Sequence, residues 1–480
     1  MKFNNVLKRI DLDNNYSNGW RPQDKCGVFA IYNYQGPDNA ALITYLGLLA
    51  LQHRGQESAG MAFNCEQGIN HIKGMGLVDH VFPRDTLFAI EPKTILGHVR
   101  YSTTGSSFAV NAQPLVARSA DQSGIALAHN GNLTNTRRLH NKLLGEGHIF
   151  HTTSDTEILL SYLSRFKRRG LVSAVQNAMN IIEGAYSAVI LDEEQLVAFR
   201  DPNGFRPLMI GCLGEAFIFA SETAALDTVG ASFIREVEPG EIVTAGPKGL
   251  SSYKQGSDSE SSLCIFEHVY FSRPDSILGG QSVYGFRKKV GSLLARRITA
   301  GLDMVIPSPD SGVSAAIGLA ESLNIPMEWA IHRNSYLGRT FIEPTQDERE
   351  MAVRLKFNPV KDLIRDRRVA IVDDSLVRGT TARVLAALLR KAGAAEVHLC
   401  IASPPYKHPC YYGIDIPLAR DLAALDSDLN YLAAEIGADS ITFAELSDLY
   451  SAVGKEQHKL CSACFTGLYP KLGKTRGKVS

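Results

Sequence analysis

Two neighbouring carboxylates and a hydroxyl-rich loop stand out in the second half of the sequence. Asp373 and Asp374 end an apolar run, and the loop SLVRGTT leads from them into residues 384–389, whose apolar positions have helical spacing. In an open α/β sheet, ligands bind beyond the carboxyl ends of the strands. Backbone N–H groups at the start of the helix would bind a phosphate, helped by the hydroxyls of Ser375, Thr380 and Thr381. Adjacent carboxylates suit ribose hydroxyls or a divalent cation, so the segment predicts a sugar-phosphate site with a metal nearby.

In the first half, Cys26 begins the apolar stretch CGVFAIYNY. A lone cysteine at the start of a strand is most often a core thiol. Here, however, polar segments follow it in order and place Arg, Asn, Thr and Asp beside predicted strands, where charge-assisted bonds can hold both ends of an amino acid. These segments are HRGQESAG (53–60), GHVRYSTTG (97–105), NAQPL (111–115), AHNGNLTN (128–135) and SDTE (154–157). Cys26 is therefore a candidate nucleophile.

A pair of cysteines near the C-terminus could bind a metal. Cys461 and Cys464 form a C-x-x-C motif, and Cys264 and Cys410 are candidates to complete four thiolates. The spacing alone leaves zinc, an iron-sulfur cluster and a reducible cysteine pair open.

Composition excludes several classes of protein. The 480 residues are 45% hydrophobic and 21% charged, which predicts a folded chain of two to four domains. Fifty Lys and Arg balance fifty Asp and Glu, so no global field favours nucleic acid or an anionic membrane as a partner. The N-terminus lacks the apolar core of a signal peptide, and no apolar run is long enough for a membrane span, so we expect a cytoplasmic protein.

The elements that position these residues differ between the two halves. Short strand-like runs separated by turn residues predict a β-rich first half, and a helix with an acidic cap is predicted from Asp38 through ALITYLGLLALQ. The Gly- and Ser-rich stretch 240–262 is the best candidate for a linker. Beyond it, helical segments alternate with the strands MVIP, RRVAIVDD and EVHLCIAS, which predicts a parallel sheet.

The first-half segments together resemble the glutaminase domain of N-terminal-nucleophile amidotransferases. In that family the cysteine is the first residue of the mature chain, so the resemblance implies that residues 1–25 are a propeptide. It also implies that Arg54, Arg100 and Asp155 hold glutamine, and that the Asn130 side chain and the Gly131 backbone N–H bind the oxyanion. The free α-amine would have a pKa of about 7.7 to 8.0, which suits it to accept the thiol proton at neutral pH.

The segment after residue 367 resembles the phosphoribosylpyrophosphate-binding motif of type I phosphoribosyltransferases. A glutaminase followed by such a domain resembles the glutamine phosphoribosylpyrophosphate amidotransferase family. Further segments that carry this resemblance are RDPNGFRPL (200–208), CIFEHVYFSRPDS (264–276), SVYGFRKKVG (282–291), PSPDSG (307–312), YLGRTFIEP (336–344) and VRLKFNP (353–359). The residues implied to bind phosphoribosylpyrophosphate are Asp373, Asp374, Ser375, Arg378, Gly379, Thr380, Thr381 and Arg339.

The resemblance also implies two cofactors. Ser311, Asp373 and Asp374 lie at the family's magnesium positions. CIFEHVYF, PCYYGID and CSACFTG resemble the iron-sulfur subclass, which implies a [4Fe–4S] cluster on Cys264, Cys410, Cys461 and Cys464. One departure lies in the loop that folds over the sugar in this family: Ser335 replaces an arginine, which removes one cation.

The implied fold is an α+β N-terminal-nucleophile domain, with stacked antiparallel sheets between helices, followed by an α/β phosphoribosyltransferase domain with a parallel sheet. The implied divisions are a propeptide (1–25), a glutaminase domain (26–255), a phosphoribosyltransferase domain with the cluster-binding segment (256–470) and a tail (471–480). The implied reaction converts phosphoribosylpyrophosphate, glutamine and water to 5-phosphoribosylamine, glutamate and pyrophosphate, as the first committed step of purine synthesis.

Expected partners are the two substrates, purine nucleotides as inhibitors, and further copies of the chain in a homotetramer. Two alternatives stay open at this point. One is a paralogous amidotransferase for another phosphosugar, and the other is a non-catalytic regulator that senses nucleotides.

Overall fold

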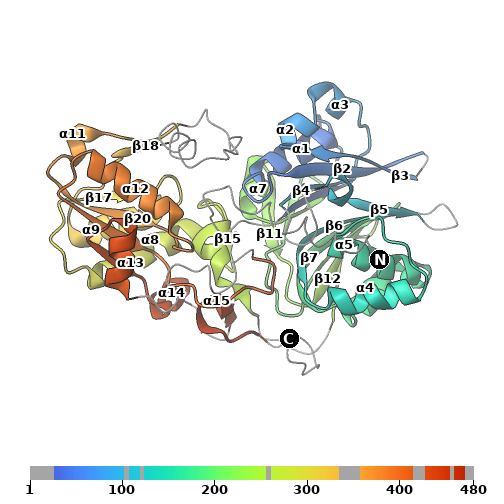
Figure 1. Ribbon diagram of the computed structural model, residues 1–480. Helices are drawn as coiled ribbons and strands as arrows, with labels where there is room; N and C mark the ends of the chain where they lie inside the picture. Colours follow the sequence, from blue (N-terminus) through green and yellow to red (C-terminus); the bar gives the residue numbers. More distant parts are fainter. Residues whose placement is uncertain are drawn as a thin grey trace, which may run out of the picture. The chain divides into compact units, whose positions relative to one another are not determined.

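The computed structural model describes residues 26–66, 68–101, 108–118, 124–255, 261–334, 357–414, 428–454 and 459–470. Within these ranges the chain forms two compact units (Figure 1). The larger unit takes residues 26–284, 408–414 and 453–470, and the smaller unit takes residues 285–407 and 428–452. The predicted propeptide and tail lie outside the described residues.

The larger unit is built on two antiparallel sheets. The seven-stranded sheet has the order β11-β9-β10-β1-β4-β2-β3, and the six-stranded sheet has the order β13-β12-β8-β7-β6-β5. The strands of the first sheet are β1 (Gly27–Tyr32), β2 (Ser58–Cys65), β3 (Gly68–Met75), β4 (Ile95–Arg100), β9 (Met209–Leu213), β10 (Ala216–Ala220) and β11 (Ser232–Glu236). Those of the second are β5 (Leu115–Arg118), β6 (Gly124–Leu133), β7 (Gly184–Leu191), β8 (Leu196–Arg200), β12 (Glu241–Gly246) and β13 (Gly249–Lys254).

The two sheets face each other, and helices cover their outer faces. Small and β-branched side chains of β1, β6, β7 and β8, such as Val28, Ala128 and Val189, fill the space between the sheets. The helices on the first sheet are α1 (Ala40–Ala50), α2 (Val78–Val81), α3 (Arg84–Phe88) and α7 (Thr223–Thr228); those on the second are α4 (Thr136–Gly145), α5 (Asp155–Phe166) and α6 (Leu171–Met179). The short 3₁₀ turns η1 (Ala109–Asn111) and η2 (Lys167–Arg169) lie beside them in the chain. The predicted arrangement of antiparallel sheets between helices is confirmed.

Two local predictions are corrected in this unit. The helix predicted from Asp38 begins at Ala40, and its cap is Asn39, whose Oδ1 accepts a hydrogen bond from the Ala41 N–H at 2.6 Å. Most of the predicted linker is a hairpin, because β12 and β13 pair from Glu241↔Lys254 to Gly246↔Gly249. The residues Pro247 and Lys248 form its turn, since Gly249 adopts the left-handed φ of +84° that a tight turn needs.

Along the sequence, the division between the two units does not fall at the single boundary expected near residue 255. Residues after the hairpin stay in the larger unit: β14 (Leu263–Cys264) pairs in parallel with β23 (Leu460–Cys461), almost 200 residues later. Here too lie η3 (Glu267–Phe271), β15 (Ile277–Leu278), β16 (Gln281–Ser282) and α15 (Ala463–Thr466). All four cysteines of the predicted cluster therefore belong to one unit, because a pairing between strands distant in sequence returns the C-terminus to it.

The smaller unit is a four-stranded parallel sheet in the order β17-β20-β21-β22, as predicted. Its strands are β17 (Met304–Pro307), β20 (Arg368–Asp373), β21 (Glu396–Ile401) and β22 (Ser440–Phe443). A hairpin of β18 (Ile331–Arg333) and β19 (Phe357–Pro359) adjoins the unit. The helices are α9 (Val313–Leu323), α11 (Lys361–Ile364), α12 (Thr380–Lys391), α13 (Leu429–Ile436) and α14 (Leu446–Val453); α8 (Val283–Leu294) and the turn η4 (Ala295–Arg297) lead into it.

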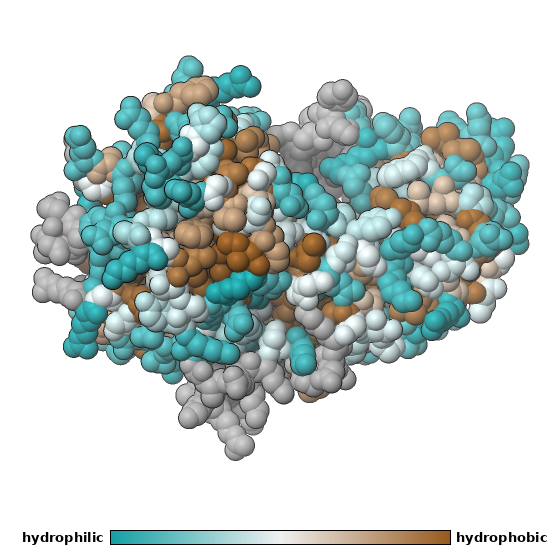
Figure 2. All heavy atoms as spheres, turned by 180° about the vertical axis from the view of Figure 1, so that it is seen from behind, coloured by the Kyte–Doolittle hydropathy of each residue, from teal (hydrophilic) through white to brown (hydrophobic). Residues whose placement is uncertain are grey.

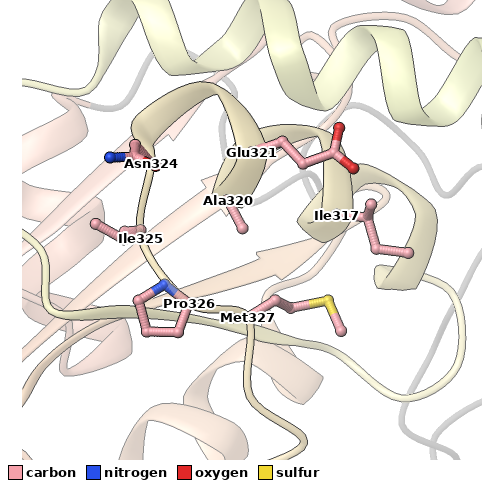
Figure 3. A pocket seen from close by; sticks show the side chains of 7 residues that line it. All are labelled: Ile317, Ala320, Glu321, Asn324, Ile325, Pro326 and Met327. Atoms are coloured by element: carbon pink, nitrogen blue, oxygen red, sulfur yellow. The ribbon is translucent and has the colours of Figure 1, made fainter.

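A shallow depression of about 400 Å³ lies beside the C-terminal half of α9 (Figure 3). Its lining is mostly apolar, and its one charged side chain, Glu321, is bound by Lys288 at 2.8 Å. The negative charge of Glu321 and the negative end of the α9 helix dipole both disfavour phosphate binding here. The depression therefore does not serve as a phosphate site.

No helix among the described residues is long and apolar enough to cross a membrane. On the face shown in Figure 2, hydrophobic side chains form patches among hydrophilic ones. In the smaller unit, Trp329, Val360 and Leu363 are exposed apolar side chains near the β18–β19 hairpin.

His98 joins the two sheets of the larger unit and makes folding sensitive to pH. Its ring on β4 lies 3.2 Å from the carbonyl of His129 on β6, and burial lowers the pKa of His98 to about 3. The unfolded chain takes up a proton below pH 6.5 and the folded chain does not, so stability is lost as the pH falls from 6.5 toward 3. Each pH unit in this window costs about 1.4 kcal/mol.

We therefore expect His98→Gln, which keeps a donor for the His129 carbonyl but cannot titrate, to flatten this dependence. Urea unfolding between pH 7 and pH 5 measures it. The free energy of unfolding of the wild type should fall more steeply than that of the variant, by about 1.4 kcal/mol per pH unit below pH 6. Equal slopes would show that His98 is not held neutral.

Candidate active sites

Cys26 and Arg100 lie side by side at the ends of neighbouring strands. Gly27 pairs with Val99 in the β1–β4 register, so Cys26 and Arg100, one residue further along each strand, face each other. The Cys26 thiol is buried and lies 3.7 Å from the carbonyl oxygen of Tyr101. The Arg100 guanidinium is also buried and lies 3.8 Å from the Glu57 carboxylate. The predicted nucleophile and a cation that could bind an α-carboxylate are therefore neighbours.

Asn130 and Gly131 provide the features that an oxyanion site needs. Asn130 on β6 is 0% exposed, and among the described residues neither its Nδ2 nor its Oδ1 has a hydrogen-bond partner. A buried amide without a partner is costly to keep and points to a ligand. Gly131 has φ +144°, and a Cβ there would lie 2.0 Å from the carbonyl oxygen of Ala185. Only glycine fits, because β7 runs so close to the backbone at this position.

Asp155 is held beside the same strand. It opens α5 after the cap Ser154, and its Oδ2 accepts a hydrogen bond from the Leu133 N–H at 2.9 Å. Its Oδ1 lies 4.0 Å from Nδ1 of His129, the residue before Asn130. Burial lowers the pKa of His129, although the charge of Asp155 acts in the opposite direction. His129, which precedes Asn130 on β6, is thus a buried ring whose uncharged form is favoured.

Arg54 is placed differently from the expectation that it contacts glutamine. Its side chain is 0% exposed, and its Nε donates to the carbonyl oxygen of Cys26 at 3.4 Å. Its other nitrogens bind two buried carboxylates: NH1 binds Glu222, and NH2 lies 3.1 Å from both oxygens of Glu267. The Arg54 guanidinium is thus enclosed by these partners and contacts the Cys26 backbone, so, contrary to the expectation, it is not open to a glutamine molecule.

The two carboxylates extend this contact into a buried network. The Glu222 carboxylate also lies 2.8 Å from Nε2 of His53 and accepts a hydrogen bond from the Ser276 hydroxyl at 2.6 Å. The Glu267 carboxylate accepts a hydrogen bond from Arg206 at 2.8 Å. Burial by itself raises the pKa of Glu222, but the charges of His53 and Arg54 outweigh it and hold that pKa below its ordinary value. The pKa of Glu267 is likewise lowered, because Arg54 and Arg206 outweigh the effect of burial. Both groups are carboxylates at neutral pH.

In the smaller unit, the residues predicted to bind a phosphate lie at the carboxyl end of β20, beside the carboxyl end of β17. Ser308, after β17, donates its N–H to Val372 O on β20 at 2.7 Å, so the two loops start together. The helices that follow, α9 and α12, both begin at this edge, and their N-terminal N–H groups can bind an anion. Gly379 caps α12 with a left-handed φ of +73°.

The predicted magnesium residues come together here. The Ser311 hydroxyl donates to Asp373 Oδ1 at 3.0 Å, and the Ser375 hydroxyl donates to Asp374 Oδ1 at 2.5 Å. Both aspartates are buried, whereas Thr380 is exposed and Arg378 and Thr381 are partly exposed. Carboxylate and hydroxyl oxygens are the ligands that magnesium prefers. Arg339 and Ser335 lie outside the described residues.

The four predicted cluster cysteines gather in the larger unit. Cys264 and Cys461 face each other in the β14–β23 pair, and the backbone N–H of His408, near Cys410, donates to Cys464 O at 3.1 Å. Burial raises the pKa of the Cys461 and Cys464 thiols, and the neighbouring thiols Cys264 and Cys410 raise it further. In the part of the chain that the structure describes, no three His, Cys, Asp or Glu side chains are grouped as for a single metal ion.

Several residues at these sites carry no signal in the sequence. Glu222, Glu267 and Arg206 lie in ordinary-looking segments, and Arg54 and Glu267 are 213 residues apart. Arg206 lies in RDPNGFRPL and Glu267 in CIFEHVYFSRPDS. Both segments carry the family resemblance, but the sequence assigns neither residue a role. Only folding shows that these charges are buried together.

Comparisons with known proteins agree with this geometry. A family model for a glutamine amidotransferase domain matches residues 98–228. The amidophosphoribosyltransferase of Bacillus subtilis (strain 168) is 43% identical over 451 residues, which covers 93% of this chain and 94% of that protein. That of Methanocaldococcus jannaschii is 43% identical over 462 residues, or 93% and 97% of the two chains. The solved structure of glutamine phosphoribosylpyrophosphate amidotransferase from B. subtilis, complexed with ADP and GMP, matches with a TM-score of 0.87 and 43% identity over 93% of this chain and 97% of that one.

The buried network makes a prediction about stability. Glu267→Gln keeps the shape of the side chain but leaves Arg54 and Arg206 with one carboxylate fewer, and breaking a buried ion pair from one side costs about 3–5 kcal/mol. Glu238→Gln is the control, because Glu238 is largely exposed and lies 3.7 Å from Lys254. We expect urea unfolding to show a loss of about 3 kcal/mol or more for the first variant and under about 1 kcal/mol for the second. A loss below 1 kcal/mol in both would contradict the network.

Proposed function

The chain belongs to the amidophosphoribosyltransferase family, and from this we propose how its residues divide the reaction between two sites. The family's reaction transfers the amide nitrogen of glutamine to phosphoribosylpyrophosphate and is the first step of purine biosynthesis. Glutamine and phosphoribosylpyrophosphate are its substrates. The observation that carries the assignment of the glutaminase site is the pairing of Cys26 with Arg100 at the ends of β1 and β4, together with the partnerless Asn130 amide on β6. His129, the residue before Asn130, contacts His98 of β4 through its carbonyl oxygen.

In the glutaminase half, the Cys26 thiolate attacks the side-chain amide of glutamine. The Arg100 guanidinium binds the substrate carboxylate and Asp155 binds its ammonium group. Charge builds on the amide oxygen in the tetrahedral intermediate, and the Asn130 amide and the Gly131 N–H stabilise it. Ammonia leaves, water hydrolyses the glutamyl thioester, and glutamate is released.

Removal of residues 1–25 is part of this proposal. It would free the Cys26 α-amine, which can accept the thiol proton directly or through water. Arg54 supports this role, because its hydrogen bond to the Cys26 carbonyl fixes the backbone that carries both the amine and the thiol.

In the phosphoribosyl half, ammonia displaces pyrophosphate from C1 of the sugar and forms 5-phosphoribosylamine. The N–H groups at the start of α12 and the hydroxyls of Ser375, Thr380 and Thr381 bind the 5-phosphate. Asp373 and Asp374 face the ribose hydroxyls. We assign Arg378, Gly379 and Arg339 to the same substrate by the family resemblance.

Magnesium fits the residues at this edge. Ser311, Asp373 and Asp374 would hold it, and the hydrogen bond between Ser311 and Asp373 already brings two of the three together. Bound magnesium would neutralise charge on the pyrophosphate leaving group.

We also propose a structural [4Fe–4S] cluster on Cys264, Cys410, Cys461 and Cys464. The donor chemistry fits, because three buried thiols and the partly buried Cys410 thiol interact electrostatically within one unit. Thiolate ligands must lose their protons, so binding would offset the raised pKa of the Cys461 and Cys464 thiols. A cluster would fasten the C-terminal segment to the rest of the larger unit.

Regulation, assembly and location are further proposals. The B. subtilis relative's structure contains ADP and GMP, which supports purine nucleotides as inhibitors here. Exposed Trp329, Val360 and Leu363 support an interface between copies of the chain, and we propose the family's tetramer. The eight cysteines, all described by the structure, form no disulfide, which suits the reducing cytoplasm.

Replacing the nucleophile tests the division of labour. Cys26→Ala should abolish glutamine-dependent synthesis of phosphoribosylamine and leave ammonia-dependent synthesis intact, because the second site uses ammonia from either source. Cys65→Ala, at an exposed thiol in a hairpin, is the matched control and should retain both activities. The two rates, measured with glutamine and with an ammonium salt, give the answer. Loss of both in Cys26→Ala would refute two separate sites.

The cluster is tested by composition and spectrum. Protein purified without oxygen should contain about four irons per chain and show a broad visible absorbance. Cys461→Ser should lose the iron and the absorbance, whereas Cys212→Ser, a thiol of the same unit outside the group, should keep both. Zinc in place of iron, or colourless wild-type protein, would reject the iron-sulfur assignment.

A further inference from the structure

We propose that the short segment Cys410–Gly413 is a positioning element for glutamine hydrolysis, because it holds the oxyanion residues Asn130 and Gly131 in place. The inference rests on the proposed function of those two residues. In the chain, the segment lies between β21 and β22 of the smaller unit, but it belongs to the larger unit. It has no part in the reaction as described so far.

Two contacts join the segment to the end of β6. The Asn132 side-chain amide donates a hydrogen bond to Tyr411 O at 3.0 Å. Gly413 packs directly against the same backbone: a Cβ there would lie 2.8 Å from the Asn132 Cβ and 3.4 Å from the Gly131 carbonyl carbon. Gly413 also has φ +96°, which glycine adopts readily. The segment therefore fits against the peptide that follows the oxyanion residues, without room for a methyl group.

A second path leads from the segment to the nucleophile. Arg206 donates to Tyr412 O at 3.1 Å and to Glu267 at 2.8 Å. Glu267 binds Arg54, and Arg54 donates to the Cys26 carbonyl. One short segment thus supports both the backbone that carries the thiol and the backbone that carries the oxyanion donors.

The segment is itself anchored. The Tyr412 ring stacks on Phe205 at 4.2 Å, and its hydroxyl donates to Pro470 O at 2.8 Å. The Tyr469 hydroxyl donates to Pro409 O at 2.7 Å. The proposed cluster ligand Cys410 would add an anchor at the beginning of the segment. A fixed support matters because a displacement of about 1 Å at an active site can reduce the rate about 100-fold.

Gly413→Ala is the direct test, with Gly170→Ala as its control. Gly170 belongs to the same unit and has nearly the same φ, +94°, but a Cβ there would meet nothing within 4 Å. Both variants place an alanine at nearly the same positive φ, and only the first presses on Gly131 and Asn132. We expect Gly413→Ala to lower kcat for glutamine hydrolysis about 100-fold with little change in KM. Gly170→Ala should keep the wild-type kcat.

Two reagents separate positioning of the oxyanion residues from general damage. The aldehyde analogue of glutamine forms a tetrahedral adduct with Cys26, so its affinity should fall with kcat in Gly413→Ala. Alkylation of Cys26 by iodoacetamide creates no oxyanion, so its rate should stay unchanged. Iron content, visible absorbance and ammonia-dependent synthesis should also match the wild type.

Asn132→Asp provides a second test if Gly413→Ala does not fold. The substitution replaces a donor to Tyr411 O by a carboxylate that the carbonyl oxygen repels. We again expect a lower kcat and weaker binding of the aldehyde, with an unchanged rate of alkylation. Wild-type kcat in the folded variants, or an equal loss of aldehyde binding and of alkylation, would overturn the inference. Cys26→Ala measured alongside keeps the two proposals apart: if it still hydrolyses glutamine, the proposed function fails, and if only the segment variants behave as wild type, the inference alone fails.

Discussion

The larger unit depends on one buried cation. Arg54 is fully enclosed, and its guanidinium is shared between Glu222, Glu267 and the carbonyl of Cys26. A buried charge is tolerated only when its hydrogen bonds are satisfied, so each of these partners must be in place for the others to be stable. The partners come from the start of β1, the helix α7 region and η3. The chemistry of the nucleophile is therefore tied to the correct assembly of segments far apart in the chain.

Both sites use the ends of strands, but for different physical reasons. In the antiparallel unit, the β1–β4 register sets Cys26 opposite Arg100, and β6 brings Asn130 to the same region. In the parallel unit, the carboxyl ends of β17 and β20 lie next to each other, so two loops and two helix N-termini converge. Antiparallel pairing thus assembles the proposed amino-acid site from side chains, whereas parallel pairing assembles the proposed anion site largely from backbone N–H groups.

The cysteine group shows how the C-terminus contributes to the larger unit. The β14–β23 pair and the hydrogen bonds of Tyr412 and Tyr469 return residues 408–414 and 459–470 to a unit whose sheets are complete by residue 254. These residues add no strand to either main sheet. They enclose Arg206 and adjoin Gly131, so their contribution is to hold existing groups in position.

The sequence by itself determined many of the local elements and the candidate residues of both sites. Strands such as MVIP and AFIFA match β17 and β10, and the order of DDSLVRGTT places acids, hydroxyls and helix as found, because these signals act over a few residues. Prediction from the sequence failed where a residue's partner lies far away in the chain. The stretch 241–254 is a hairpin, since pairing with β8 outweighs its turn-rich composition. Arg54 is internal, and only the tertiary structure places two carboxylates from 168 and 213 residues away around it. Burial and the balance of buried charge are properties of the assembled fold, and no local pattern encodes them.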